Sequence, residues 1–209
     1  MNSVAREILP PNGSHGEHHL RDVTLAGKTI EIGKSDVYDS IFDCQLVNCT
    51  IRTFRGARGV SIADCTLESC TIEAKKELKN LRLTRLIMRD CTLLGRYTGC
   101  RFGGEDADER AEITGCDFSK AKLFDLCDFL YGADVSSLTL PVWPHITITG
   151  VATNRSRWMA LPLPKSLHVL QGVVGYENSI ANAVSIYLPA HYAQYEDLRD
   201  VFDGEDYIR

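Results

Sequence analysis

Several features of other protein classes are absent from this chain of 209 residues. It contains no apolar run near the roughly 20 residues that a membrane-spanning helix needs. Its first 19 residues include no apolar segment like that of a secretory signal peptide. Positive charge is not in excess, since 23 Lys and Arg residues stand against 28 Asp and Glu residues. We therefore expect a cytoplasmic protein that binds neither membranes nor nucleic acid directly.

Sequence motifs of common enzymes are also missing. No GxSxG, Walker A, HExxH or GxGxxG pattern occurs. His15, His18 and His19 could bind a metal, but they lie in a Gly- and Pro-rich stretch with no second ligand group at a compatible spacing. Asp43 and Asp64 are 21 residues apart, and we interpret both as turn-forming residues. We expect no catalytic residues, no metal and no cofactor.

The eight cysteines are the most informative residues of the chain. No two of them are three residues apart, so the CxxC pairs typical of zinc sites do not occur. Each cysteine instead begins a tripeptide that ends in Leu, Ile or Phe. Because residues i and i+2 of a strand point to the same side, we expect each thiol to point inward with its large apolar neighbour. The cysteines are Cys44, Cys49, Cys65, Cys70, Cys91, Cys100, Cys116 and Cys127.

The same residues recur with a period of 21. Cys44 and Cys65 have this separation, as do Cys49 and Cys70, and five residues separate the members of each pair. Apolar columns that keep the period are Leu20, Ile41, Ile62 and Leu83, then Leu25, Leu46, Leu67 and Met88, then Ile30, Ile51, Ile72 and Leu93. Five residues per side and four sides per turn predict a solenoid of short strands stacked roughly 4.8 Å apart. Residues 20–135 would supply about 5.5 turns.

These repeats resemble those of pentapeptide-repeat proteins. The resemblance is carried by segments 41–51 (IFDCQLVNCTI), 62–72 (IADCTLESCTI) and 114–123 (TGCDFSKAKL), in which a small residue stands two positions before a large apolar one. It implies an all-β fold, a right-handed parallel β-helix with four sides per turn. Most members of this family are not enzymes, many act through protein–protein contacts, and some are acidic rods that mimic duplex DNA and bind topoisomerases.

The repeat divides the chain into three predicted regions. Residues 1–19 form an N-terminal tail or cap, 20–135 the solenoid, and 136–209 a non-repeat C-terminal cap that contains some helix and ends in an acidic helical tail. The segment 103–112, GGEDADERAE, interrupts the repeat and is expected to form an exposed loop. Within the cap, the alternation of Ile146–Thr149 predicts a strand. Residues 169–174 read as a second strand, and 178–202 as a helix broken at a proline.

Charged residues gather in two candidate partner-binding surfaces. The 21-residue period places Lys34, Arg55 and Lys76 in one column, and Arg58 and Lys79 in the next. Unpaired, these cations would form a basic face that suits an anionic partner, and neighbouring glutamates such as Glu73 and Glu77 are the alternative explanation. The C-terminal tail carries six carboxylates against two arginines. The carboxylates are Glu196, Asp197, Asp200, Asp203, Glu205 and Asp206.

A rigid, charge-polarised chain without cofactors is typical of an interaction protein. We expect it to bind and inhibit a protein partner, in the manner of an immunity protein or antitoxin, because opposite charge accelerates association. Three alternatives remain open: a DNA mimic that modulates a topoisomerase, a structural scaffold or assembly subunit, and a β-helix enzyme that acts on a polymer. The C-terminal region could also form a homodimer.

Overall fold

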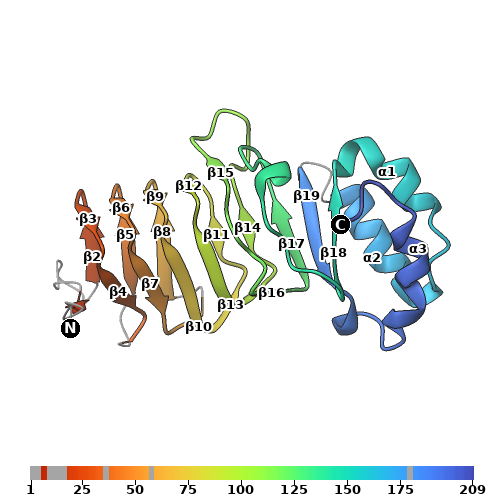
Figure 1. The fold of residues 1–209 in the computed structure, drawn as a ribbon, viewed down its shortest axis with the longest axis horizontal. Helices are drawn as coiled ribbons and strands as arrows, with labels where there is room; N and C mark the ends of the chain where they lie inside the picture. The colour runs from red at the N-terminus through yellow and green to blue at the C-terminus, as the bar shows by residue number, and fades with distance from the viewer. Residues whose placement is uncertain (1–5, 9–17, 35–37, 57–58, 178–180) are drawn as a thin grey trace.

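A computed structural model describes residues 6–8, 18–34, 38–56, 59–177 and 181–209. Over these residues the chain winds into a parallel β-solenoid of about four turns with about 21 residues per turn. The turns stack along the longest axis of the molecule, and the helices gather at the C-terminal end (Figure 1). The predicted fold class, a β-solenoid with a non-repeat cap that contains some helix, is confirmed.

Strands lie on three sides of the turns and stack in parallel on their counterparts in neighbouring turns. The first side holds β2 (His18–Arg21), β5 (Asp39–Phe42), β8 (Val60–Ala63), β11 (Arg82–Leu83), β14 (Arg101–Phe102) and β17 (Leu126–Phe129). The second side holds β3 (Thr24–Ala26), β6 (Gln45–Val47), β9 (Thr66–Glu68), β12 (Ile87–Arg89) and β15 (Glu112–Thr114). The third side holds β1 (Arg6–Ile8), β4 (Thr29–Ile32), β7 (Thr50–Thr53), β10 (Thr71–Lys79), β13 (Thr92–Thr98) and β16 (Ala121–Phe124).

The strand register reproduces the period of the sequence. Paired residues in consecutive turns include Ile41 with Ile62, Leu46 with Leu67, and Ile51 with Ile72. The later turns are longer, since Thr92 pairs with Asp117. The extra residues lie in the predicted loop 103–112, which stands out from the solenoid beside β15 in Figure 1, although Gly103 and Gly104 are buried and Glu112 begins β15. Longer late turns explain why the solenoid has fewer turns than simple division by 21 predicts.

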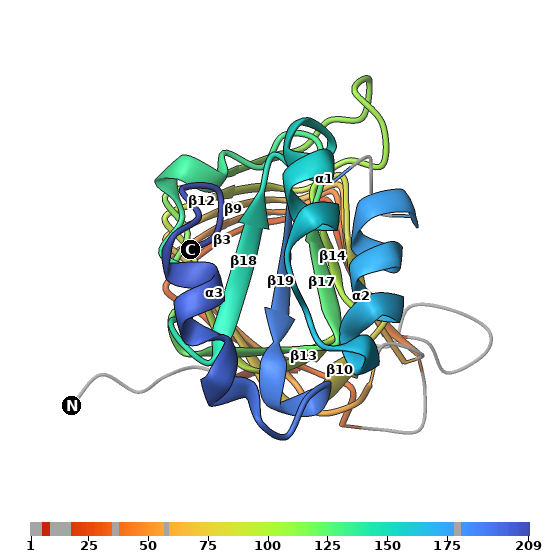
Figure 2. The same ribbon diagram turned by 90° about the vertical axis from the view of Figure 1, so that its right-hand side faces the viewer.

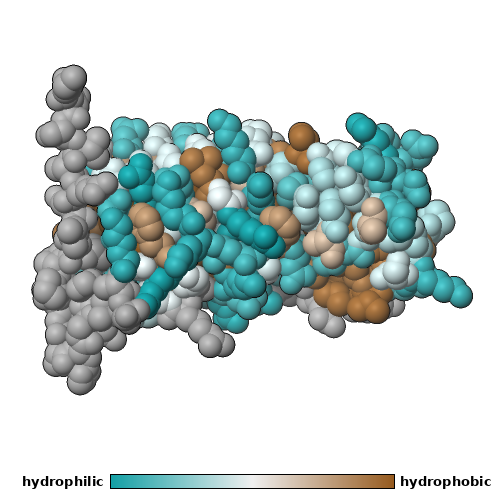
Figure 3. Space-filling view, turned by 90° about the horizontal axis from the view of Figure 1, so that it is seen from below, coloured by the Kyte–Doolittle hydropathy of each residue, from teal (hydrophilic) through white to brown (hydrophobic). Residues whose placement is uncertain are grey.

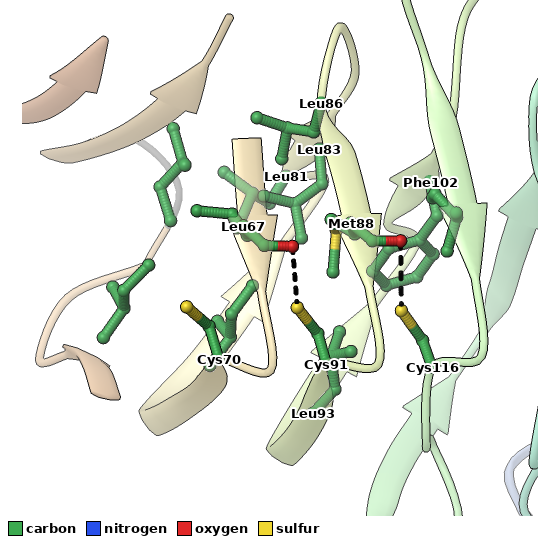
Figure 4. Close-up of a cluster of buried hydrophobic side chains, with 14 of the residues drawn as sticks. Leu67, Cys70, Leu81, Leu83, Leu86, Met88, Cys91, Leu93, Phe102 and Cys116 are labelled. Atoms are coloured by element: carbon green, nitrogen blue, oxygen red, sulfur yellow. Dashed lines mark hydrogen bonds between the residues drawn. The ribbon is translucent and has the colours of Figure 1, made fainter. Parts of the chain in front are cut away.

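The eight thiols are free, and every one is buried inside the solenoid. Figure 4 shows Cys91 and Cys116 one turn apart, each directed at a backbone carbonyl of the preceding turn. The Cys91 thiol donates to the carbonyl of Leu67 at 3.3 Å, and the Cys116 thiol donates to that of Met88 at 3.6 Å. The cysteines therefore pack as small apolar residues whose weak donors join successive turns.

The corners of the solenoid have left-handed backbone conformations. Asp43 and Asp64, which sequence analysis interpreted as turn residues, have φ values of 53° and 55°. Short polar residues tolerate this region better than other side chains do, because they hydrogen-bond locally. Both aspartates precede a buried cysteine, so these corners direct the next side chain into the core.

Two antiparallel strands cover the open C-terminal end. Strand β19 (Ala183–Tyr187) pairs with β17, and β18 (His145–Thr149) pairs with β19. They satisfy a solenoid edge that would otherwise present unpaired peptide groups. In Figure 2 these strands cross the end of the solenoid, with α1 and α2 on one side and α3 on the other. Tyr207–Arg209 extend the sheet, since Arg209 N donates to Thr147 O at 3.0 Å.

The cap has its own hydrophobic core between β18, β19 and the helices. The helices are α1 (Val151–Ala160), α2 (His168–Gly172) and α3 (Arg199–Asp203), with a π-helical turn η4 (Val173–Glu177). Short 3-10 turns are η2 (Val135–Ser137), η3 (Lys165–Leu167), η5 (Leu188–Ala190) and η6 (Tyr195–Leu198). No helix among the described residues has both the length and the apolar character needed to cross a bilayer.

Two predictions for the cap are wrong, and one is confirmed. Residues 146–149 lie in β18, as the alternating pattern indicated. Residues 169–174 are helical rather than extended, because Leu167, Leu170 and Val174 share a helical face buried in the cap core. Residues 178–202 do not form one helix. Those described in this range form β19, two 3-10 turns and the start of α3.

Candidate functional site

The predicted basic column lies among carboxylates. Lys34 forms an ion pair with Glu31, and its Nζ atom lies 4.8 Å from the centre of the Phe54 ring. Lys79 pairs with Glu77 at 3.2 Å. Arg55 lies just after the end of β7, one turn of the solenoid on from Lys34. Lys76 lies in β10 and is exposed. Arg58 lies outside the described residues.

A ladder of alternating charges also crosses the third side. Glu31, Arg52 and Glu73 occupy aligned positions on β4, β7 and β10. Arg52 Nε lies 3.0 Å from Glu73 Oε2, and its Nη1 lies 3.7 Å from Glu31 Oε1. Hydrogen bonds from Lys75 and then Arg52 hold the pKa of Glu73 below its usual value. The carboxylates thus neutralise much of the positive charge on this side.

The second side of the solenoid carries a matching ladder. Arg89 lies between Glu68 and Glu112, which belong to the strands on either side of it. Its guanidinium binds Glu112 through two nitrogens, at 2.8 and 2.6 Å, and reaches Glu68 at 3.4 Å. Opposite charges therefore alternate along this side. Such a pattern differs from the continuous acidic face that a mimic of duplex DNA requires.

The acidic residues of the tail differ in the ion pairs that they form. Glu205 and Asp206 each lie 2.8 Å from the guanidinium of Arg157. Asp203 pairs weakly with Arg199, at 3.8 Å. Asp197 and Asp200 are exposed and form no ion pair with any residue that the structure describes. These two carboxylates lie on η6 and at the start of α3.

A groove of about 610 Å³ lies beside α3 at the cap end. One wall is the extended segment 138–143, the other is α3, and β18 and the C-terminal segment contribute the floor. Its apolar lining includes Leu140, Val142, Ile146, Phe202 and Ile208. The volume is within the range of ligand-binding clefts in proteins. Sequence spacing could not reveal the groove, because its walls come from segments about 60 residues apart.

Trp143 lines the groove and contacts the acidic tail. Its indole Nε1 donates to Glu196 Oε2 at 3.1 Å. The centres of the Trp143 and Tyr195 rings are 6.0 Å apart, and the Arg199 guanidinium carbon lies 5.7 Å from the Trp143 ring centre. Sequence analysis did not single out Trp143, although a tryptophan within the proline-flanked segment Pro141–Pro144 is a signal for a binding surface.

Exposed apolar surface is concentrated in the cap. Figure 3 shows mostly hydrophilic side chains on this face of the solenoid and a larger hydrophobic patch towards the helical end. Val142, at the groove, is 80% exposed, and Val169 of α2 is 77% exposed. Apolar surface with a polar rim is typical of a protein-binding site.

The histidines do not assemble a metal site in the described part of the chain. No group of three or more His, Cys, Asp or Glu residues there could hold a metal ion. His19 hydrogen-bonds Ser40, whereas His15 lies outside the described residues. His145 and His191 are largely buried in the cap, and burial lowers the pKa of both, that of His145 to about 4. Both imidazoles are therefore neutral at pH 7.

Comparisons with known proteins identify no relative. No protein-family model matches the chain, and no curated protein or solved structure matches it. The structure itself shows a parallel β-solenoid whose geometry is compatible with pentapeptide repeats.

Proposed function

We propose that this chain is a non-catalytic interaction protein of the pentapeptide-repeat type, which binds a protein partner through its cap end and inhibits it. An immunity protein or antitoxin acts in this way. The observation that carries the proposal is that Asp197 and Asp200 are exposed on the segment that forms η6 and α3, of which Arg199, Phe202 and Asp203 line the apolar groove. These carboxylates are exposed and unpaired among the described residues, whereas many charges of the solenoid take part in ladders.

This combination favours the acidic tail over the basic column as the contact surface. A buried apolar contact supplies most of the binding free energy at an interface, and surrounding charges steer the approach of the partner. The partner we propose has a basic surface around an apolar feature. Nucleases and other nucleic-acid enzymes have such surfaces, because they bind phosphates. The buried free thiols fit a reducing compartment such as the cytoplasm.

Charge reversal at the cap tests the proposal. The full chain is cross-linked to its partner in host extract, the partner is identified by mass spectrometry and purified, and its activity is titrated with the chain. We expect stoichiometric inhibition, with Asp200→Lys weakening the affinity by about tenfold and more at low salt than at high salt.

Asp108→Lys provides the matched control. Asp108 is exposed in the 103–112 loop and gives the same change in net charge away from the cap. We expect it to leave the inhibition unchanged. A partner that binds but keeps full activity would contradict inhibition, and equal effects of the two substitutions would contradict the cap as the contact surface. A defined oligomer of the chain alone would favour the assembly alternative.

A further inference from the structure

We infer that the groove beside α3 is a vacant strand position, which accepts an extended segment of the partner as an added β-strand. The inference rests on the proposed function and specifies how that partner is bound. The segment we expect has apolar side chains at alternate positions and a basic residue at the end that meets α3.

The first observation concerns the backbone of the groove wall. Thr139 pairs with the preceding turn, since its N–H donates to Cys116 O at 3.0 Å and its carbonyl accepts from Phe118 N at 2.7 Å. Peptide groups alternate in direction along an extended chain. The N–H and carbonyl of Leu140 therefore face the opposite way, towards the cap end, and neither forms a hydrogen bond with any residue that the structure describes.

The position of this wall in the solenoid explains why the edge is open. Thr92, Asp117 and Thr139 are stacked as bridge partners on successive turns of the third side. The segment around Thr139 is therefore the last layer of that side, and the groove occupies the place of a further layer. The cap strands continue the first side instead, where β19 pairs with β17.

The opposite wall supplies apolar contacts. Phe202 on the α3 wall and Ile208 on the floor also line the groove. Ile208 pairs with Ile148 of β18 at an isolated antiparallel bridge, so the C-terminal segment is the outer edge of the cap sheet. An inserted strand would lie between these two edges. It would place every second side chain on the apolar floor, as in strand addition to a sheet edge.

Charge at one end of the groove sets the chemistry of the occupant. Asp203 lines the groove, and its ion pair with Arg199 is long, at 3.8 Å. Asp200 and Asp197 lie nearby along the chain and are unpaired among the described residues. A lysine or arginine at this end of the segment would meet Asp203, which shares the lining with Arg199 and Arg209, while Asp197 and Asp200 are exposed outside the lining. The occupant is therefore an apolar strand with a basic flank.

Hydrogen exchange of the free chain tests the open edge. We expect the amide of Thr139 to be protected by its bond to Cys116, and the amide of Leu140 to exchange rapidly. The exchange of both amides is measured by two-dimensional NMR on the full chain. Protection of Leu140 in the free protein would show that the edge is already satisfied and would overturn the inference.

A synthetic peptide then tests strand addition. The probe is the acetylated, amidated heptapeptide Lys-Val-Thr-Val-Thr-Val-Lys, and the control is the same peptide N-methylated at alternate residues. We expect saturable shifts at the Leu140 amide and the Trp143 indole, with a Kd below about 1 mM. N-methylation removes hydrogen bonds but keeps the side chains, so we expect binding about tenfold weaker or more. No saturable binding, or equal binding of both peptides, would overturn strand addition.

Failure here is distinguishable from failure of the proposed function. In the complex with the intact partner, we expect the Leu140 amide to become protected. If the partner is inhibited with an affinity that depends on Asp200, but the Leu140 amide still exchanges rapidly in the complex, strand addition is overturned. The proposed function is then supported. A chain that binds the peptide but inhibits no partner would do the reverse.

Discussion

Asp64 and Arg85 occupy equivalent corners of successive turns, and Arg85 Nε donates to Asp64 Oδ1 at 2.9 Å. Both residues have left-handed backbone conformations, with φ values of 55° and 57°. The conformation is easy for an aspartate and unfavourable for an arginine. The corner is therefore imposed by the stacking of neighbouring turns, which overrides the local preference of Arg85, and the ion pair follows from that stacking.

The same reasoning predicts how corner substitutions act. Asn48 is exposed at a corner with a φ of 52°, and its side chain forms no hydrogen bond within the described structure. Asn48→Val should lower the free energy of unfolding by about 1–2 kcal/mol, since a β-branched residue resists this conformation. Asn48→Gly should change it by less than about 0.5 kcal/mol. Urea unfolding followed by circular dichroism measures both variants, and equal stabilities would contradict the role of the corner.

The buried thiols should be unreactive in the folded protein. Each cysteine is at most 1% exposed. Burial raises the pKa of Cys127, and that of Cys100 to about 11, whereas hydrogen bonds with neighbouring thiols lower the pKa of Cys44 and Cys116. Because even a thiolate must be accessible to react, we expect no labelling by a disulfide reagent such as DTNB at pH 8 in native buffer. All eight thiols should react in denaturant. Rapid labelling of any thiol under native conditions would show that its layer of the solenoid opens.

The solenoid could be predicted from the sequence because its order is local and periodic. Each cysteine and its apolar neighbour repeat at a spacing that only stacked turns bury, so Ile41, Ile62 and their counterparts on other sides are found in register. The cap has no such period. Strand β19 is apolar on both faces, because Ala183 packs on the solenoid core and Val184 on the cap core, and such a strand does not alternate.

The candidate site was only partly predictable for a related reason. The acidic tail is contiguous in sequence, so its charge was evident, but the engagement of Glu205 by Arg157 depends on the packing of α1 against the C-terminal segment. The groove brings Leu140 together with Phe202, residues that no spacing rule connects. The charge columns were predicted from the period, whereas Glu31 and its ion pair with Lys34 were not anticipated.

Replacement of Asp128 should stabilise the protein in a pH-dependent way. This carboxyl is buried between β14 and β19, and desolvation raises its pKa from 3.8 to about 6, although Arg101 lies 3.5 Å away. A raised carboxyl pKa means that stability is fully present below pH 3.8 and is lost as the pH rises through 6. Asp128→Asn should therefore raise the free energy of unfolding at pH 7.5 by up to about 3 kcal/mol.

The difference between the two proteins should vanish below about pH 3, where the carboxyl is protonated in both folded and unfolded chains. Measuring wild type and Asp128→Asn at each pH cancels the contributions of other titrating groups, including the buried histidines. A constant difference across the range would mean that Asp128 acts through packing rather than through its charge.

Gln171 should hold the two main helices of the cap together. It is buried, and its Nε2 donates to Trp158 O at 2.7 Å, while the Trp158 indole donates to Gln171 O at 2.9 Å. Gln171→Leu removes the side-chain amide that donates to the Trp158 carbonyl near the end of α1. We expect a loss of about 1–3 kcal/mol in the free energy of unfolding, with a change in tryptophan fluorescence. The control Gln45→Leu makes the same exchange at an exposed position of β6, and equal losses would contradict the role of Gln171.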